Sequence, residues 1–125
     1  MSHTFFILGA VFALIGVAAG AFGAHTLRDM LTTHYLHVFE TGVRYQMYHA
    51  FALIFTAWAL DKYNDTYFRF AGWVFTAGII LFSGSLYILA LTGTGWLGAI
   101  TPFGGVLFLA GWLLLIIGFF SSKKA

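Results

Sequence analysis

The sequence predicts an all-α, polytopic membrane protein: four transmembrane helices in a bundle, with a short amphipathic interfacial helix between the first and the second. The first reason is composition, because 61% of the 125 residues are hydrophobic and only 8% are charged, whereas about 25% of a soluble domain is charged. The second reason is four apolar runs, each close to the roughly 20 residues that a helix needs to cross a bilayer. Only short segments separate these runs, so residues 1–125 are expected to form a single transmembrane domain.

The composition also excludes several classes of protein. So few charges cannot cover a water-exposed surface, and so much apolar sequence is incompatible with intrinsic disorder. The absence of cysteine excludes a disulfide scaffold, a thiolate metal site and thiol catalysis. The six Lys and Arg residues form no basic patch, so we expect no nucleic-acid partner. The expected partner is the lipid bilayer.

The first predicted span covers residues 4–24 and carries no charge. Its segment Ala19-Gly20-Ala21 resembles a signal-peptide cleavage site, but no Lys or Arg precedes the apolar run, which favours a transmembrane helix. Apolar side chains then repeat on one side of a helix over residues 26–38, at Leu27, Met30, Leu31, Tyr35 and Val38. This pattern predicts a short helix in the membrane interface. The alternative is that these residues extend the second span.

The second and third predicted spans cover residues 40–60 and 67–91. The second is charged only in its first two turns, and the third only at Arg69. Residues 61–65 form the polar turn between them, and the segment 92–95, with two glycines, ends the third. The fourth span covers residues 102–120, where Thr101 and Pro102 predict an N-cap followed by proline at the first helical position.

Basic residues predict the orientation, because Lys and Arg collect in the loops on the cytoplasmic side of a membrane. One side of a four-span chain carries Lys62, Arg69, Lys123 and Lys124. The other side carries Arg28 and Arg44. We therefore expect a multi-pass protein of the inner or plasma membrane with both termini in the cytoplasm.

Glycines recur at seven-residue spacing in the first and fourth spans. The two series are Gly9, Gly16 and Gly23, and Gly104, Gly111 and Gly118; Gly20 adds a GxxxG pair with Gly16. Such spacing keeps a groove on one helix face, where a neighbouring helix can approach closely. We expect the first and fourth helices to pack against each other within the molecule. A subunit interface, in a homo-oligomer or with another membrane protein, is the alternative.

Polar side chains gather in the half of the bundle assigned to the outer leaflet. They are His25, Glu40, Arg44, Tyr45, Gln46, Tyr48, His49, Ser83, Ser85, Tyr87 and Thr101. Glu40 and Arg44 stand four residues apart and are expected to form a charge pair. Two interpretations stay open: a hydrogen-bonded cluster that fixes helix register, or a cavity for a lipid headgroup or small molecule between the first three helices.

Metal binding and catalysis receive little support. The residues of His34-x-x-His37-x-x-Glu40 fan out over about 240° of a helix and do not converge. His25 and His49 would have to pair from two helices to bind a metal or haem. No spacing specifies a catalytic triad or a phosphate-binding loop. We therefore expect no metal, no cofactor and no catalytic residue.

Four motifs carry a resemblance. They are Gly20-Ala21-Phe22-Gly23-Ala24-His25, Phe39-Glu40-Thr41-Gly42-Val43-Arg44-Tyr45-Gln46-Met47-Tyr48-His49-Ala50, Phe82-Ser83-Gly84-Ser85-Leu86-Tyr87 and Gly98-Ala99-Ile100-Thr101-Pro102-Phe103-Gly104-Gly105. Together they resemble the small membrane proteins of domain-of-unknown-function family 423. The resemblance implies a four-helix integral membrane protein and brings no established activity or cofactor.

Three hypotheses for function follow. The first is a non-enzymatic membrane protein whose polar cluster organises the bundle and binds a lipid headgroup or small molecule. The second is a membrane enzyme or redox component that uses Glu40, His49 and His25. The third is a subunit or assembly factor of a larger complex, with the glycine series facing partner helices.

Overall fold

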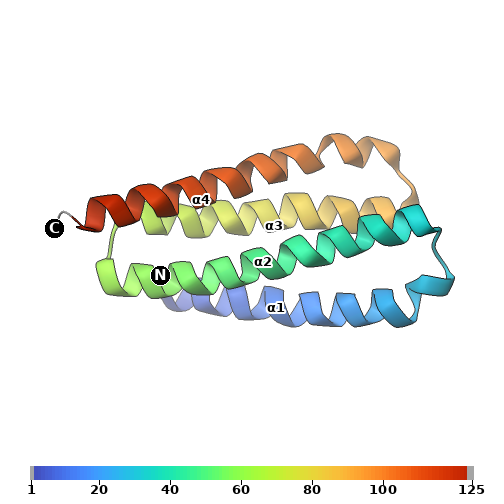
Figure 1. Ribbon diagram of the computed structural model, residues 1–125, viewed down its shortest axis with the longest axis horizontal. Helices are drawn as coiled ribbons and strands as arrows, with labels where there is room; N and C mark the ends of the chain where they lie inside the picture. The colour runs from blue at the N-terminus through green and yellow to red at the C-terminus, as the bar shows by residue number, and fades with distance from the viewer. Residues whose placement is uncertain (1, 124–125) are drawn as a thin grey trace.

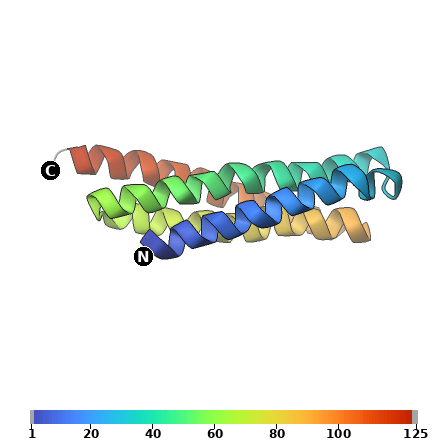
Figure 2. The same ribbon diagram turned by 90° about the horizontal axis from the view of Figure 1, so that it is seen from below.

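The computed structural model describes residues 2–123, and the side chains of residues 2–122, as a bundle of four long helices. The elements are α1 (Ser2–His25), the 3-10 helix η1 (Leu27–Asp29), α2 (Thr33–Tyr63), α3 (Thr66–Thr92), the 3-10 helix η2 (Gly95–Ala99) and α4 (Thr101–Lys123). Successive long helices run antiparallel, with both chain ends and the α2–α3 turn at one end of the bundle (Figures 1 and 2). Lys124 and the side chain of Lys123, which contributed to the predicted orientation, lie outside the described residues.

Among the described residues, three helices meet the length and hydropathy that a membrane span requires: α1, α3 and the segment Gly95–Ser122, which contains nearly all of α4. The prediction of apolar helices over residues 4–24, 67–91 and 102–120 is confirmed within a few residues at each end. The second helix differs from the prediction. It begins at Thr33, so residues 33–38 extend α2, and the prediction of a separate helix over residues 26–38 is wrong.

The cause is a helix cap that the apolar pattern concealed. Thr32 has extended backbone, and its hydroxyl accepts a hydrogen bond from the Tyr35 amide at 3.3 Å, which satisfies one of the free N–H groups in the first turn. Only the three residues of η1 remain between this cap and the end of α1. The apolar residues of this stripe therefore do not share one helix: Leu27 belongs to η1, whereas Tyr35 and Val38 belong to α2.

The remaining boundaries have equally local causes. Asn64 ends α2 in the left-handed conformation with φ of 50°, and Asp65 caps α3 by accepting from the Tyr67 amide at 2.9 Å. Gly93 ends α3 with φ of 70°, as the segment 92–95 predicted. The predicted N-cap at Thr101 is wrong, because η2 leads into α4 with helical backbone and Thr101 is already a helical residue.

Each glycine series packs against the helix that is adjacent in the chain. On α1, Gly9, Gly16 and Gly23 face Ile54, Met47 and Phe39 of α2. On α4, Gly104, Gly111 and Gly118 face Phe82, Phe75 and Phe68 of α3. The expected packing of the first helix on the fourth is therefore wrong, since short connections place sequential helices side by side. The glycine series are filled within the molecule and are not free for a partner helix.

Helix α3 lies between α2 and α4 and packs along both, while α1 packs along α2. The largest apolar core surrounds Phe5, Phe68 and Phe75, all fully buried, and a smaller one surrounds Leu27 and Phe39 near the opposite end. Although α2 and α4 share α3 as a neighbour, they touch each other at few points. This arrangement leaves a lateral opening between α2 and α4.

Candidate functional site

Gln46 is the centre of the buried polar groups, with 2% of its surface exposed. Its side-chain amide donates to the carbonyl of Phe12 on α1 at 2.8 Å. Its side-chain oxygen accepts from the Tyr87 hydroxyl of α3 at 2.6 Å. One side chain of α2 thereby joins three helices. Gly42, one turn earlier, makes room for the Tyr87 ring, since a Cβ there would lie 2.8 Å from it.

Two serines of α3 extend these connections. The Ser83 hydroxyl donates to the Gly42 carbonyl of α2 at 2.7 Å. The Ser85 hydroxyl lies 2.6 Å from the Thr101 hydroxyl of α4 and 2.9 Å from the Phe82 carbonyl of its own helix. These buried side chains thus use their hydrogen-bonding groups on one another and on helix carbonyls. We call Gln46, Ser83, Ser85, Tyr87 and Thr101 the paired cluster.

His49 lies outside the paired cluster, between α2 and α4. Its Nδ1 is 2.7 Å from the Tyr45 carbonyl, and its Nε2 accepts from the Trp112 indole N–H at 3.1 Å. An indole nitrogen only donates, so Nε2 carries no proton and Nδ1–H donates to the carbonyl. The imidazole is therefore neutral in this arrangement. Its ring stacks on Phe108 of α4, with centroids 3.5 Å apart and planes 7° apart.

The charged residues of the predicted cluster do not join these groups. His25, Glu40 and Arg44 are exposed, and no salt bridge joins Glu40 to Arg44 in the described part of the chain. Glu40 precedes His49 by nine residues on α2, about 13 Å along the axis. His25 ends α1, where Gly23 packs on Phe39, so it lies near the start of α2.

The exposed histidines of α2 do not gather into a site either. His34 and His37 are exposed on its first turns. Within residues 2–123 no three His, Asp or Glu side chains lie close enough to hold a metal ion.

Two partners of His49, Trp112 and Phe108, are not among the site residues predicted from the sequence. One signal was present. Trp112 is the only tryptophan in the middle of a predicted span, away from the interfaces where the indole N–H finds water. A partner on another helix was therefore required.

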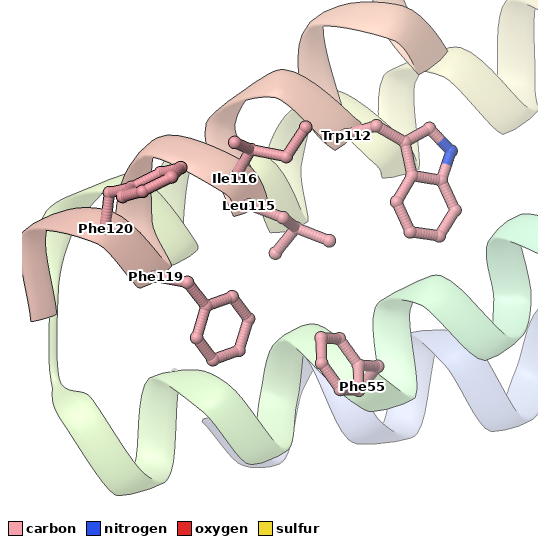
Figure 3. Close-up of a pocket in the computed structure, with 6 residues that line it drawn as sticks. All are labelled: Phe55, Trp112, Leu115, Ile116, Phe119 and Phe120. Atoms are coloured by element: carbon pink, nitrogen blue, oxygen red, sulfur yellow. The ribbon is translucent and has the colours of Figure 1, made fainter. Parts of the chain in front are cut away.

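The α2–α4 groove is the opening on which His49 lies. Its first part, the His49 segment, has a volume of about 400 Å³ and is lined by Tyr45, Tyr48, His49, Phe82, Gly105, Phe108, Leu109 and Trp112. Its second part, the Phe55 segment, also has about 400 Å³ and is lined by Phe55, Trp112, Leu115, Ile116, Phe119 and Phe120. In the Phe55 segment, Leu115 and Phe119 of α4 point toward α2, where Phe55 stands opposite (Figure 3). Trp112 lines both parts.

A further groove of about 410 Å³ lies between α1 and α2 near the chain ends, lined by residues that include Phe6, Ile7, Trp58 and Asp61. It is remote from the paired cluster, which stands nearer the other end of both helices. The side chains of the paired cluster contact one another and helix carbonyls. They are therefore not available to line the predicted ligand cavity between the first three helices.

Apolar helices of membrane-spanning length, joined by buried hydrogen bonds and glycine contacts, define a helical integral membrane protein. Within that class the chain belongs to the family described as "Protein of unknown function (DUF423)", whose model matches residues 19–105. The resemblance inferred from the four sequence motifs is thus confirmed. The matched range includes Gln46, His49 and Tyr87 but ends before Trp112.

Relatives extend the similarity over almost the entire chain. "UPF0382 membrane protein SAB0533" of Staphylococcus aureus (strain bovine RF122 / ET3-1) is 51% identical over 116 residues, which cover 93% of this chain and 94% of the relative. "UPF0382 membrane protein YwdK" of Bacillus subtilis (strain 168) is 50% identical over 114 residues, which cover 90% and 93%. No solved structure matches the chain.

Proposed function

We propose that this protein is a non-enzymatic integral membrane protein that binds a hydrophobic, membrane-dissolved molecule in the α2–α4 groove. The paired cluster holds α1, α2 and α3 in register and carries no chemistry of its own. The chain crosses the plasma membrane four times, with both termini in the cytoplasm.

In this proposal α2 crosses the membrane in addition to α1, α3 and α4. It is less apolar than these helices because Glu40, Arg44, Asp61 and Lys62 lie toward its ends. Residues 45–60 between them carry no charge. Since α2 packs along both α1 and α3, it must cross whatever layer they cross. Its 31 residues extend about 46 Å, longer than a hydrocarbon core of about 30 Å. Glu40 and Asp61 stand 21 positions apart, about 32 Å along the axis, and so reach the two faces of the core, while Arg44 lies about 6 Å inside the face that Glu40 reaches.

The proposal of a binding role without catalysis is supported by where the polar groups lie. The paired cluster contacts itself, Glu40 stands about 13 Å from His49 along α2, and the two nitrogens of His49 already have partners. No acid–base pair with a free position for a substrate results. A redox or enzymatic role for Glu40, His49 and His25 would require a large rearrangement.

The observation that carries the proposal is the α2–α4 groove. Ligand sites are typically concave, about 300–1,000 Å³ in volume, mostly apolar, and supplied with a few fixed polar groups. The groove matches these sites in volume and lining: its two parts of about 400 Å³ are lined mainly by aromatic rings, and Trp112 to His49 is the one hydrogen bond that joins α2 to α4 in residues 2–123. Exposed lining residues such as Tyr48 and Ile116 show that it is open to the lipid side.

Native mass spectrometry of the protein, released gently from membranes, tests this function. Ile116 lines the Phe55 segment and is 54% exposed, so Ile116→Trp should fill the groove without disturbing the core. Leu113, on the same helix and 57% exposed, does not line the groove and provides the control Leu113→Trp. We expect an excess mass on wild type and on Leu113→Trp that Ile116→Trp loses. Bare protomer masses for wild type, or equal retention by both variants, would overturn the proposal.

A further inference from the structure

The His49 segment lies near the middle of the membrane. Tyr48 is the central residue of α2, fifteen positions from both Thr33 and Tyr63, and thus about 22 Å from either end of the helix. Half of the hydrocarbon core is only about 15 Å thick. Phospholipid headgroups lie beyond this depth, and the charged group next to the segment is the exposed Arg44, about 6 Å from Tyr48 along α2.

Two phenol hydroxyls in the His49 segment have no partner at that depth. Tyr45 and Tyr48 are 37% and 52% exposed, and neither hydroxyl makes a hydrogen bond within residues 2–122. In the paired cluster, by contrast, the Tyr87 hydroxyl donates to Gln46. An unpaired hydroxyl in hydrocarbon is unfavourable, so these two donors favour a ligand that brings acceptors.

The other polar groups of the segment are already occupied. Trp112 donates to His49, and His49 donates to the Tyr45 carbonyl. The groups left for a ligand are therefore two O–H donors, with no fixed charge among the lining residues. A neutral molecule with carbonyl oxygens matches this set, whereas an ion or a phosphate does not.

The surroundings of the hydroxyls favour a flat molecule. Tyr45 packs on Phe82 with ring centroids 4.8 Å apart and on Tyr48 at 5.6 Å. Trp112, which is 43% exposed, supplies a further ring from α4. Aromatic faces and edges of this kind hold planar ring systems by offset stacking.

The Phe55 segment continues from Trp112 with almost no polar surface. Five of its six lining residues are Phe, Leu or Ile, and the sixth is Trp112 itself. A hydrocarbon chain attached to the planar ring would find an apolar path there. The two segments together therefore match a planar, carbonyl-bearing head joined to a long tail.

We propose that the α2–α4 groove binds an isoprenoid quinone, with its carbonyl oxygens accepting from Tyr45 and Tyr48 and its tail along the Phe55 segment. The inference rests on the proposed function and adds the chemical class of the ligand. It concerns binding alone.

Tryptophan quenching by a short-chain ubiquinone with two isoprene units tests the inference. Trp58→Phe, Trp73→Phe and Trp96→Phe leave Trp112, which lines both segments, as the sole indole of the chain. In this background we expect saturable quenching. Tyr45→Phe with Tyr48→Phe keeps both rings and removes both donors, so affinity should fall about tenfold or more. Tyr63→Phe with Tyr67→Phe, outside the groove, is the matched control and should change nothing.

Geranylgeraniol, an isoprenoid tail without the quinone ring, separates the two proposals when used as a competitor. Weak competition, together with loss of affinity in the Tyr45 and Tyr48 variant, supports the quinone. If geranylgeraniol competes as well as the quinone and the tyrosine variant binds normally, the quinone inference fails while the groove retains its function. Absence of saturable quenching, together with bare masses in native spectra, would overturn both.

Discussion

Replacing Gln46 with leucine should destabilise the bundle by about 2–3 kcal/mol. The substitution removes two hydrogen bonds that join α2 to α1 and α3, each with a net contribution of about 1 kcal/mol. It also leaves the Tyr87 hydroxyl without its acceptor, which adds a further cost because that group has no water to turn to. Leucine is close to glutamine in size, so little of the loss comes from a cavity.

The companion variant Tyr87→Phe should cost about 1 kcal/mol, since it removes one bond and leaves the Gln46 oxygen unpaired. The double variant should cost about 2 kcal/mol, no more than Gln46→Leu alone, because an apolar pair leaves neither partner unsatisfied. The coupling free energy between the two sites is then about 1–2 kcal/mol.

Reversible unfolding in mixed micelles at increasing fractions of a denaturing detergent, followed by tryptophan fluorescence, measures these values. Thr41→Val is a suitable control, because its hydroxyl only returns to the His37 carbonyl of its own helix. It should change stability by less than about 0.5 kcal/mol. If the two single effects add to the double effect within about 0.3 kcal/mol, Gln46 and Tyr87 do not interact and the reasoning is wrong.

Three further substitutions test the packing and the caps by the same unfolding measurement. Gly111→Ala would place a Cβ 2.5 Å from the buried Phe75 ring and should cost about 1–3 kcal/mol. Its control, Gly84→Ala, meets nothing within 4 Å and should be neutral or stabilising. Equal effects of the two variants would contradict the packing of Gly111 on Phe75. Trp112→Phe removes the α2–α4 hydrogen bond and should cost about 1 kcal/mol, with His49→Phe adding little in the double variant. Asp65→Ala removes the cap of α3 and should cost about 1 kcal/mol, with Asp61→Ala, which caps nothing, as its control.

The sequence predicted three apolar helices well because each depends on local composition. Almost no charge occurs in residues 4–24, 67–91 and 102–120. In an apolar environment a single segment can hydrogen-bond all of its backbone N–H and C=O groups only as a helix. The start of α2 was missed for the opposite reason. A single extended residue at Thr32 decided it, and the apolar stripe of residues 27–38 runs straight across that residue.

The glycine series show what spacing alone leaves undetermined. The seven-residue period of Gly104, Gly111 and Gly118 indicated a close helix contact but not the partner. The missing half was also in the sequence, since Phe68, Phe75 and Phe82 repeat with the same period in α3. An antiparallel neighbour connected by a short loop pairs the two series in reverse order, as the structure does.

The candidate site was predicted by type and not by pairing. Gln46, Ser83, Ser85 and Tyr87 were placed in one half of the bundle, but which hydroxyl meets which carbonyl depends on how each helix is rotated about its axis. Hydropathy fixes that rotation weakly in a membrane protein, because lipid and core are both apolar. The same ambiguity concealed His49 and Trp112, which come from helices that are 63 residues apart in sequence.

The groove follows from the unequal way in which α4 is held. Three phenylalanines of α3 pack against three glycines of α4 and hold α4 to α3 along its length. In addition, Phe108 of α4 packs against Gly78 of α3. Against α2, α4 has the Trp112 hydrogen bond and the Phe108–His49 stack. Helix α4 is thus held to α3 along its length but to α2 only near His49. The space between α2 and α4 on either side of this contact forms the His49 and Phe55 segments. Drawing α4 onto α2 would require breaking the glycine contacts with α3, so the opening is maintained by the packing itself and does not depend on a bound molecule.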